Sequence, residues 1–143
     1  MIESPAVGFT GSRYGMSLLQ ARTLRKLLAE GPWKVLHHGD CVGCDVTAHG
    51  FARELGLAVV VHPPESNVLR ARLASTQVVP PLPYLDRNRA IVMSADHVIA
   101  TPRSVAERSG GTWYTIRYAV RHGKPVSVID LGGRVLDEEE IGR

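Results

Sequence analysis

Residues 34–63, KVLHHGDCVGCDVTAHGFARELGLAVVVHP, contain one complete strand, helix and strand, and they decide the fold class. KVLHHG and LAVVVHP are predicted strands, and the apolar run of the second is typical of a strand covered on both faces. Between them, apolar residues recur at helical spacing from about Val46 to Leu55, and Gly56 ends the helix. This unit predicts two parallel strands joined by a right-handed crossover.

The same alternation continues along the chain. Further strands are predicted in AVGFTG, DHVIATP and PVSVID, and further helices in SLLQARTLRKLLAE, YLDRNRAIVMSA and TWYTIRYAVRHG. A capping box of Ser17 and Gln20 begins the first of these helices, the second is entered through Asp86, and Thr112 is the expected N-cap of the third. Five strands that alternate with helices predict an α/β protein: a Rossmann-like, doubly wound, mainly parallel five-stranded sheet with helices on both faces.

At 143 residues the chain has the length of one domain, residues 1–143. Five prolines mark residues 63–84 as a proline-rich excursion, which we expect to be a surface lid or binding loop. The polar tail, residues 131–143, is expected to add a short edge strand or to fray. No apolar run approaches the roughly 20 residues that span a bilayer, and the N-terminus has no leader-like segment, so we expect a cytoplasmic protein without membrane contact.

The formal net charge of +3 comes from arginines dispersed along the chain. This distribution argues against a dedicated nucleic-acid arm and is compatible with an anionic ligand.

Glycine-rich turns follow the predicted strands, at the sheet edge where such folds bind ligands. In TGSRYG, the backbone N–H groups of Gly11 to Arg13 could converge on a phosphate that Arg13 closes, or the glycines could simply permit a sharp turn. In SGGTW, Gly110 and Gly111 expose amides at the start of the last helix in the same way. We expect the two turns to face each other across one crevice.

Cys41 and Cys44 lie in the turn after the second strand. They could be small structural residues, a redox pair or metal ligands, although a zinc site normally needs a second ligand pair that the chain does not offer. His37 and His38 must point to opposite faces of the sheet. No metal and no cofactor is therefore predicted, and Asp45 is expected either to cap the following helix or to bind a ribose hydroxyl.

Two more charged residues are expected near the crevice. Arg87 and Arg89 begin the helix before DHVIATP, where they could face the ligand or solvent. Glu107 is the sole carboxylate between Pro102 and Gly110, although it could be an ordinary surface charge.

Four segments in this order, GFTGSRYG, HHGDCVGCDVTAHGFARELG, PYLDRNRAIVMSADHVIATP and RSGGTWYTIRYAVRHGKPVSVI, resemble the SLOG superfamily over nearly the whole chain. The likeness is greatest to its small stand-alone bacterial and phage members. Relatives include the Lonely Guy phosphoribohydrolases and the core of DNA-processing protein A. In this group the second turn commonly reads Gly-x-x-x-Gly-x-Asp, here Gly39 to Asp45. The resemblance implies a domain that binds a nucleotide or nucleotide-derived ligand across the first, second and fourth strand ends.

The resemblance to the phosphoribohydrolases is incomplete. Arg87 occupies the position of their arginine, but the position of their glutamate falls on Thr115 or Arg117. Loss of a general acid or base removes about 10²- to 10⁴-fold in rate. Cleavage would then need Glu107 or Asp45 to act from another direction.

Three functions follow from these observations. The first is binding of a nucleotide through its phosphate and ribose, in a chain expected to form a homodimer. The alternative is hydrolysis of the N-glycosidic bond of a nucleoside monophosphate, with Arg87, Glu107 and Asp45 as catalytic candidates. The second alternative is binding of single-stranded DNA. The predicted ligand-binding residues are Gly11, Ser12, Arg13, Gly39, Asp40, Gly43, Asp45, Arg87, Gly110, Gly111 and Thr112.

Overall fold

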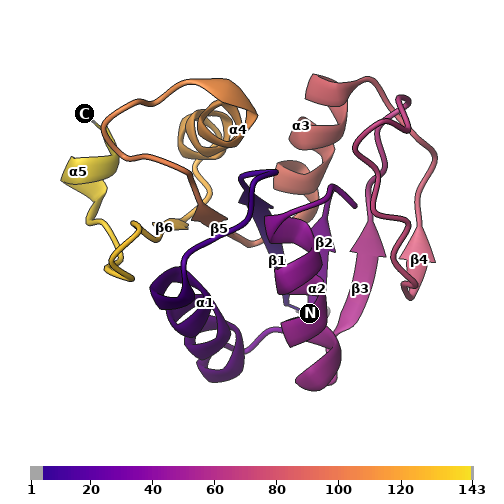
Figure 1. Ribbon diagram of the computed structural model, residues 1–143, viewed down its shortest axis with the longest axis horizontal. Helices are drawn as coiled ribbons and strands as arrows, with labels where there is room; N and C mark the ends of the chain where they lie inside the picture. Colours follow the sequence, from indigo (N-terminus) through magenta and orange to yellow (C-terminus); the bar gives the residue numbers. More distant parts are fainter. Residues whose placement is uncertain (1–4, 143) are drawn as a thin grey trace.

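Six parallel strands form one sheet in the computed structural model, which describes residues 5–142 (Figure 1). The strands are β1 (Ala6–Gly11), β2 (Val35–His38), β3 (Ala58–Val61), β4 (Gln77–Val78), β5 (His97–Thr101) and β6 (Val126–Val128). The helices are α1 (Leu18–Glu30), α2 (Cys44–Glu54), α3 (Tyr84–Ser94), α4 (Gly110–Arg121) and α5 (Glu138–Gly142).

The strand order, β4-β3-β2-β1-β5-β6, reverses at β1. Val7 of β1 is in register with Leu36 of β2 on one side and with His97 of β5 on the other. The chain first builds the sheet outward from β1 in one direction and then returns to continue on the other side. In open sheets of this kind, the crevice at the carboxyl ends of the strands beside this switch point binds ligands.

The apolar side chains form separate cores on the two faces of the sheet. Leu24 and Leu28 of α1 pack with Ala48 of α2 against one face. Val92 of α3 and Ala119 of α4 pack together in another cluster, and α3 lies beside α4. The prediction of a doubly wound sheet with helices on both faces is confirmed.

The prediction of five strands was one too few. The extra strand, β4, lies inside the proline-rich excursion and pairs with β3, with Gln77 in register with Val60. It has only two residues and both are exposed, so no hydrophobic alternation marked it in the sequence.

The predicted start of α1 is confirmed, whereas three other helices begin earlier than predicted. Ser17 and Gln20 form the expected capping box. Helix α2 begins at Cys44, two residues early, and α3 begins at Tyr84 rather than near Asp86. Helix α4 begins at Gly110 with Ser109 as its N-cap, so the assignment of Thr112 as N-cap was wrong.

The polar tail folds back on the domain. Val135 makes an antiparallel bridge to Ile129, and α5 follows. The Arg134 guanidinium contacts both carboxylate oxygens of Glu140 at 2.8 and 2.6 Å, and Arg108 donates to the Glu140 carbonyl at 2.8 Å. Residue 143 lies outside the described part of the chain. Within residues 5–142, no helix has the length and apolar character needed to cross a membrane.

Candidate functional site

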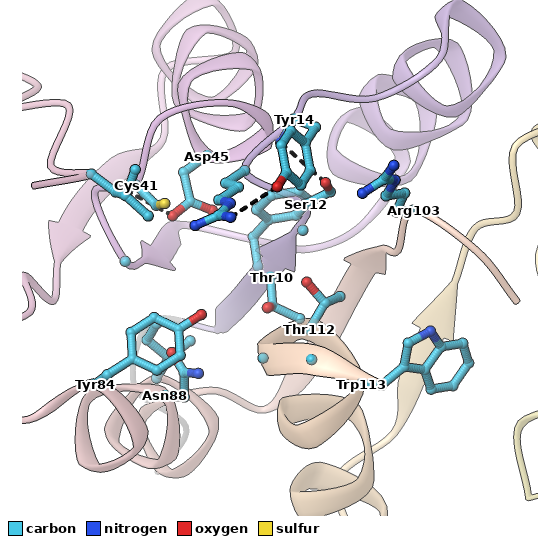
Figure 2. Close-up of a pocket in the computed structure, with 18 of the residues that line it drawn as sticks. Thr10, Ser12, Tyr14, Cys41, Asp45, Tyr84, Asn88, Arg103, Thr112 and Trp113 are labelled. Atoms are coloured by element: carbon cyan, nitrogen blue, oxygen red, sulfur yellow. Dashed lines mark hydrogen bonds between the residues drawn. The ribbon is translucent and has the colours of Figure 1, made fainter. Parts of the chain in front are cut away.

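A cavity of about 720 Å³ opens at the carboxyl ends of β1, β2 and β5 (Figure 2). Its volume lies within the roughly 300 to 1,000 Å³ typical of small-molecule sites. Figure 2 shows Tyr14 and Asp45 on one side of it and Tyr84, Asn88 and Thr112 on the other. Of the predicted site residues, the following line the cavity: Gly11, Ser12, Arg13, Gly39, Asp45, Arg87, Glu107, Gly110, Gly111 and Thr112. Asp40 and Gly43 do not.

The turn after β1 is a packing contact as well as a cavity wall. The Ser12 amide donates to the Thr101 carbonyl at 3.3 Å, and the Ser12 carbonyl accepts from the Cys44 amide at 3.0 Å. A side chain at Gly11 would lie 2.5 Å from both Cys44 Cβ and Thr101 Oγ1. The Ser12 amide is therefore engaged within the protein, and the capping box at Ser17 closes the start of α1. What this turn offers an anion is chiefly the Arg13 side chain.

Gly43 has a similar structural role. Its φ of +89° favours glycine, and a side chain there would collide with the Arg13 backbone. The Gly-x-x-x-Gly-x-Asp turn thus lets two loops touch.

The N-terminus of α4 opens into the cavity. Gly110, Gly111 and Thr112 all line it, and the N-cap Ser109 makes no side-chain capping bond. The first N–H groups of a helix have no partner within it and carry its positive dipole end. A side chain at Gly111 would collide with the Tyr84 hydroxyl, so glycine keeps this end accessible.

Arg87 is fixed at the cavity wall and is only 4% exposed. Its Nε donates to Asn88 Oδ1 at 2.7 Å, and its Nη1 donates to the carbonyls of Gly39 and of His62, the latter at 3.2 Å. The guanidinium carbon lies 5.0 Å from the centre of the Tyr84 ring. Most of the donors of Arg87 therefore hold the protein together, and Nη2 has no hydrogen-bond partner among residues 5–142.

Asp45 is a buried carboxyl group in the cavity wall, 6% exposed. Burial raises its pKa to about 6, although hydrogen bonds from the Cys41 and Gly39 amides and the charge of Arg87 act in the opposite direction. The Cys41 amide donates to Asp45 Oδ2 at 3.0 Å. Gly43, not Asp45, is the N-cap of α2, so Asp45 is not the capping residue.

This pKa predicts how stability depends on pH. A carboxyl group whose pKa is raised from 3.8 to about 6 favours folding fully below pH 3.8, and this contribution is lost as pH rises through 6. We expect Asp45→Asn to be more stable than the natural chain by about 2 to 3 kcal/mol at pH 7.5, with the difference vanishing near pH 4. Urea unfolding at both pH values measures it, and a difference independent of pH would contradict it.

Glu107 lines the cavity from the loop between β5 and α4. Ser104 orders this loop, since its hydroxyl accepts the amides of Ala106 and Glu107 at 3.1 and 3.0 Å. The Trp113 indole N–H donates to the Ser104 carbonyl at 2.7 Å. Glu107 is exposed at this rim, so its carboxylate is available to a ligand.

The two cysteines have different environments. Cys44 is buried against Gly11, whereas Cys41 is partly exposed and lines the cavity. Burial raises the pKa of both thiols, which disfavours the thiolate that redox or metal chemistry needs. Residues 5–142 hold no group of three or more His, Cys, Asp or Glu side chains arranged for a metal ion. A structural role fits Cys44, which is buried against Gly11.

Asp40, predicted to bind ribose, instead binds the proline-rich excursion. Its carboxylate is buried and accepts hydrogen bonds from Arg70 Nε and the Leu73 amide, both at 2.9 Å, and from the Arg72 amide at 3.2 Å. Leu69, in the same excursion, lines the cavity, and its carbonyl accepts a hydrogen bond from the Val42 amide at 2.9 Å. Asp40 therefore positions part of the cavity wall.

His38 and His49 form a hydrogen-bonded pair next to Asp40. The Asp40 amide donates to His38 Nδ1 at 2.8 Å, so the His38 proton lies on Nε2, which donates to His49 Nδ1 at 3.0 Å. Burial lowers the pKa of His38 to about 3, which keeps it neutral. His37 contacts His62 instead, as expected for neighbours on opposite faces of a strand.

Several lining residues were absent from the sequence prediction. Tyr14, Tyr84, Asn88 and Arg103 all face the cavity. Tyr14 and Tyr84 are 67% and 51% exposed, which is high for aromatic rings. The sequence did carry a signal for the two tyrosines, because Tyr14 lies in the glycine-rich turn TGSRYG and Tyr84 ends the proline-rich excursion.

Comparison with known proteins addresses the fold. No family model and no curated protein matches the sequence. A molybdenum cofactor binding protein from Rippkaea orientalis has a TM-score of 0.71 at 24% identity, over 91% of this chain and 78% of that one. The molybdenum cofactor carrier protein from Chlamydomonas reinhardtii has a TM-score of 0.63 at 21% identity, over 89% and 77%. DNA processing protein A from Streptococcus pneumoniae has a TM-score of 0.67 at 23% identity, over 88% and 50%.

These three structures share the parallel α/β sheet described above and cover most of this chain. At such identities the likeness concerns the fold. It shows that the chain has the Rossmann-like α/β fold that these structures share.

Proposed function

We propose that the protein binds a small molecule that joins a phosphate group to a planar ring, as a nucleotide does, in the cavity beside β1 and β5. The observation that carries this proposal is the uncapped N-terminus of α4, which opens into the cavity. Helix ends of this kind bind phosphate through backbone N–H groups and the helix dipole. Three guanidinium groups and two carboxyl groups line the cavity, and the pKa of Asp45, about 6, leaves some of it uncharged near neutral pH. The charged groups of the lining therefore carry a net positive charge, which favours an anionic ligand.

The remaining lining groups suit the rest of such a ligand. Asp45 and Asn88 offer buried polar atoms for ribose hydroxyls. Tyr84 presents an exposed ring for stacking, and Arg87 supports that ring from one face. The two similar molybdenum cofactor proteins support a small-molecule ligand for this fold. The molybdenum cofactor therefore belongs among the candidate ligands.

A second candidate function is hydrolysis of the N-glycosidic bond. The observation in its favour is Asp45, a buried cavity carboxyl whose pKa of about 6 suits proton transfer near neutral pH. The position of the phosphoribohydrolase glutamate offers no carboxylate. Thr115 donates to the Gly111 carbonyl, and Arg117 donates to the Arg108 carbonyl. Cleavage would rest on Asp45 or Glu107.

A thermal-shift screen with nucleoside monophosphates, cyclic nucleotides and the molybdenum cofactor tests both functions when each mixture is then analysed for free base. Ligand at one hundred times its Kd stabilises by about 2.7 kcal/mol. A shift with intact ligand supports binding, and a shift with released base supports hydrolysis. Absence of any shift would contradict both. Homodimerisation and single-stranded DNA binding stay predictions, checked by light scattering and by salt-dependent titration.

Gly111→Ala provides a matched variant for this screen. The added methyl group should push the Tyr84 hydroxyl into the cavity, which weakens ligand binding at least about tenfold and costs little stability because the phenol end can move. Gly50→Ala is the control, since Gly50 lies exposed in α2 with open space around it. It should stabilise by about 0.5 to 1 kcal/mol and leave binding unchanged. Equal binding by Gly111→Ala and the natural chain would count against the α4 site.

A further inference from the structure

Two arginines at the cavity rim are stacked on one tyrosine ring. Arg13 and Arg103 follow different strands, β1 and β5, and their guanidinium carbons lie 5.0 and 4.7 Å from the centre of the Tyr14 ring. Arg13 also donates from Nη2 to the Tyr14 hydroxyl at 2.8 Å. Figure 2 shows Arg103 reaching out beside Tyr14 from the end of β5. The shared ring thus keeps two positive charges within about 10 Å of each other.

Most hydrogen-bond donors of these two guanidiniums are unused. A guanidinium carries five N–H donors. Within residues 5–142, Arg13 uses one of them on the tyrosine and Arg103 uses none. Neither has a carboxylate within ion-pair distance there, whereas Arg70 and Arg134 both do. The rim therefore presents two unpaired cations to whatever enters the cavity.

The backbone beneath both side chains is held in place. Ser12, next to Arg13, donates its amide to the Thr101 carbonyl at 3.3 Å. Ser104, next to Arg103, accepts the Trp113 indole N–H at 2.7 Å. The backbone that carries Arg13, after β1, and Arg103, after β5, is therefore held in place. An anion that binds the two guanidiniums needs to order only their side chains, because the loops are already ordered.

We propose that Arg13 and Arg103 form a second anion subsite and that the ligand carries two phosphate groups, as a nucleoside diphosphate does. This inference rests on the proposed function, in which the N-terminus of α4 holds one phosphate. A monophosphate held there leaves the rim guanidiniums unmatched, whereas a second phosphate accepts bidentate hydrogen bonds from them. Both guanidiniums lie against the ring of Tyr14, at the rim where the second phosphate would bind.

Calorimetric titration with AMP, ADP, GMP and GDP, free of magnesium and at one fixed ionic strength, tests the subsite. We expect the diphosphate of the preferred base to bind at least about tenfold more tightly than its monophosphate. Arg13→Gln and Arg103→Gln should each weaken the diphosphate about tenfold and leave the monophosphate within twofold. Arg22→Gln removes an exposed arginine of α1, outside the cavity, and should leave both affinities within about twofold.

The outcomes separate the two proposals. Equal affinities for monophosphate and diphosphate in the natural chain would overturn the second subsite and leave the proposed function standing. A uniform loss in Arg103→Gln would also overturn it, because the arginine would then serve the first phosphate. If neither class of nucleotide binds, the proposed function fails, and this inference fails with it.

Discussion

Replacing Asp40 with alanine should destabilise the fold by about 3 to 5 kcal/mol, because the substitution removes a buried carboxylate that pairs with the partly exposed Arg70 and accepts two backbone amides. The carboxylate is buried and is bonded to Arg70 and to the amides of Arg72 and Leu73. Arg72 has a φ of +61°, which is unfavourable for a side-chain-bearing residue and is held in place by these bonds. Without Asp40, the excursion should detach locally.

Limited proteolysis and urea unfolding measure this effect together. Trypsin cleaves after arginine, so release of the excursion should expose Arg70 and Arg72 to cleavage well before the domain unfolds. Asp86→Ala is the matched control, because Asp86 makes an exposed pair with Arg89 at 3.4 Å. It should change stability by no more than about 0.5 kcal/mol. An Asp40→Ala variant as stable and as resistant to trypsin as the control would refute the role of Asp40.

The order of the main elements was predictable because each strand and helix carries a local signal. The apolar run at Ala58–Val61 and the capping box at Ser17 are properties of a few neighbouring residues, and the structure confirms both. Strand β4 carries no such signal. Its two exposed residues, Gln77 and Val78, are held by pairing with β3, which depends on the path of the whole excursion.

The candidate site was predictable to the extent that parallel strands bring their turns together. Gly11, Gly39 and Gly111 meet at one cavity for that reason. The role of Asp40 was not predictable, because its partners follow it by about thirty residues and lie in a segment without periodicity. Adjacent residues in such a turn also point in different directions. Asp40 therefore lies outside the cavity although its neighbour Gly39 lines it.

Arg87→Met should destabilise the protein by about 3 to 5 kcal/mol, a cost beyond that expected for a residue whose sole role is to bind ligand. The methionine leaves the carbonyls of Gly39 and His62 and the Asn88 side chain without their donor. It also removes the positive charge that lowers the pKa of Asp45, so this carboxyl should become harder to ionise.

The double variant Asp45→Asn/Arg87→Met isolates this coupling between the two buried groups. At pH 7.5 it should recover about 1 to 2 kcal/mol relative to the sum of the single effects, because no carboxylate is then left without its cation. Urea unfolding followed by tryptophan fluorescence gives all four values of the cycle. Arg22→Met, an exposed substitution on α1, should cost no more than about 0.5 kcal/mol. If Arg87→Met were as mild as this control and yet abolished ligand binding, Arg87 would be a ligand residue alone. A large loss in stability instead means that the same guanidinium fixes the wall of the cavity before any ligand arrives.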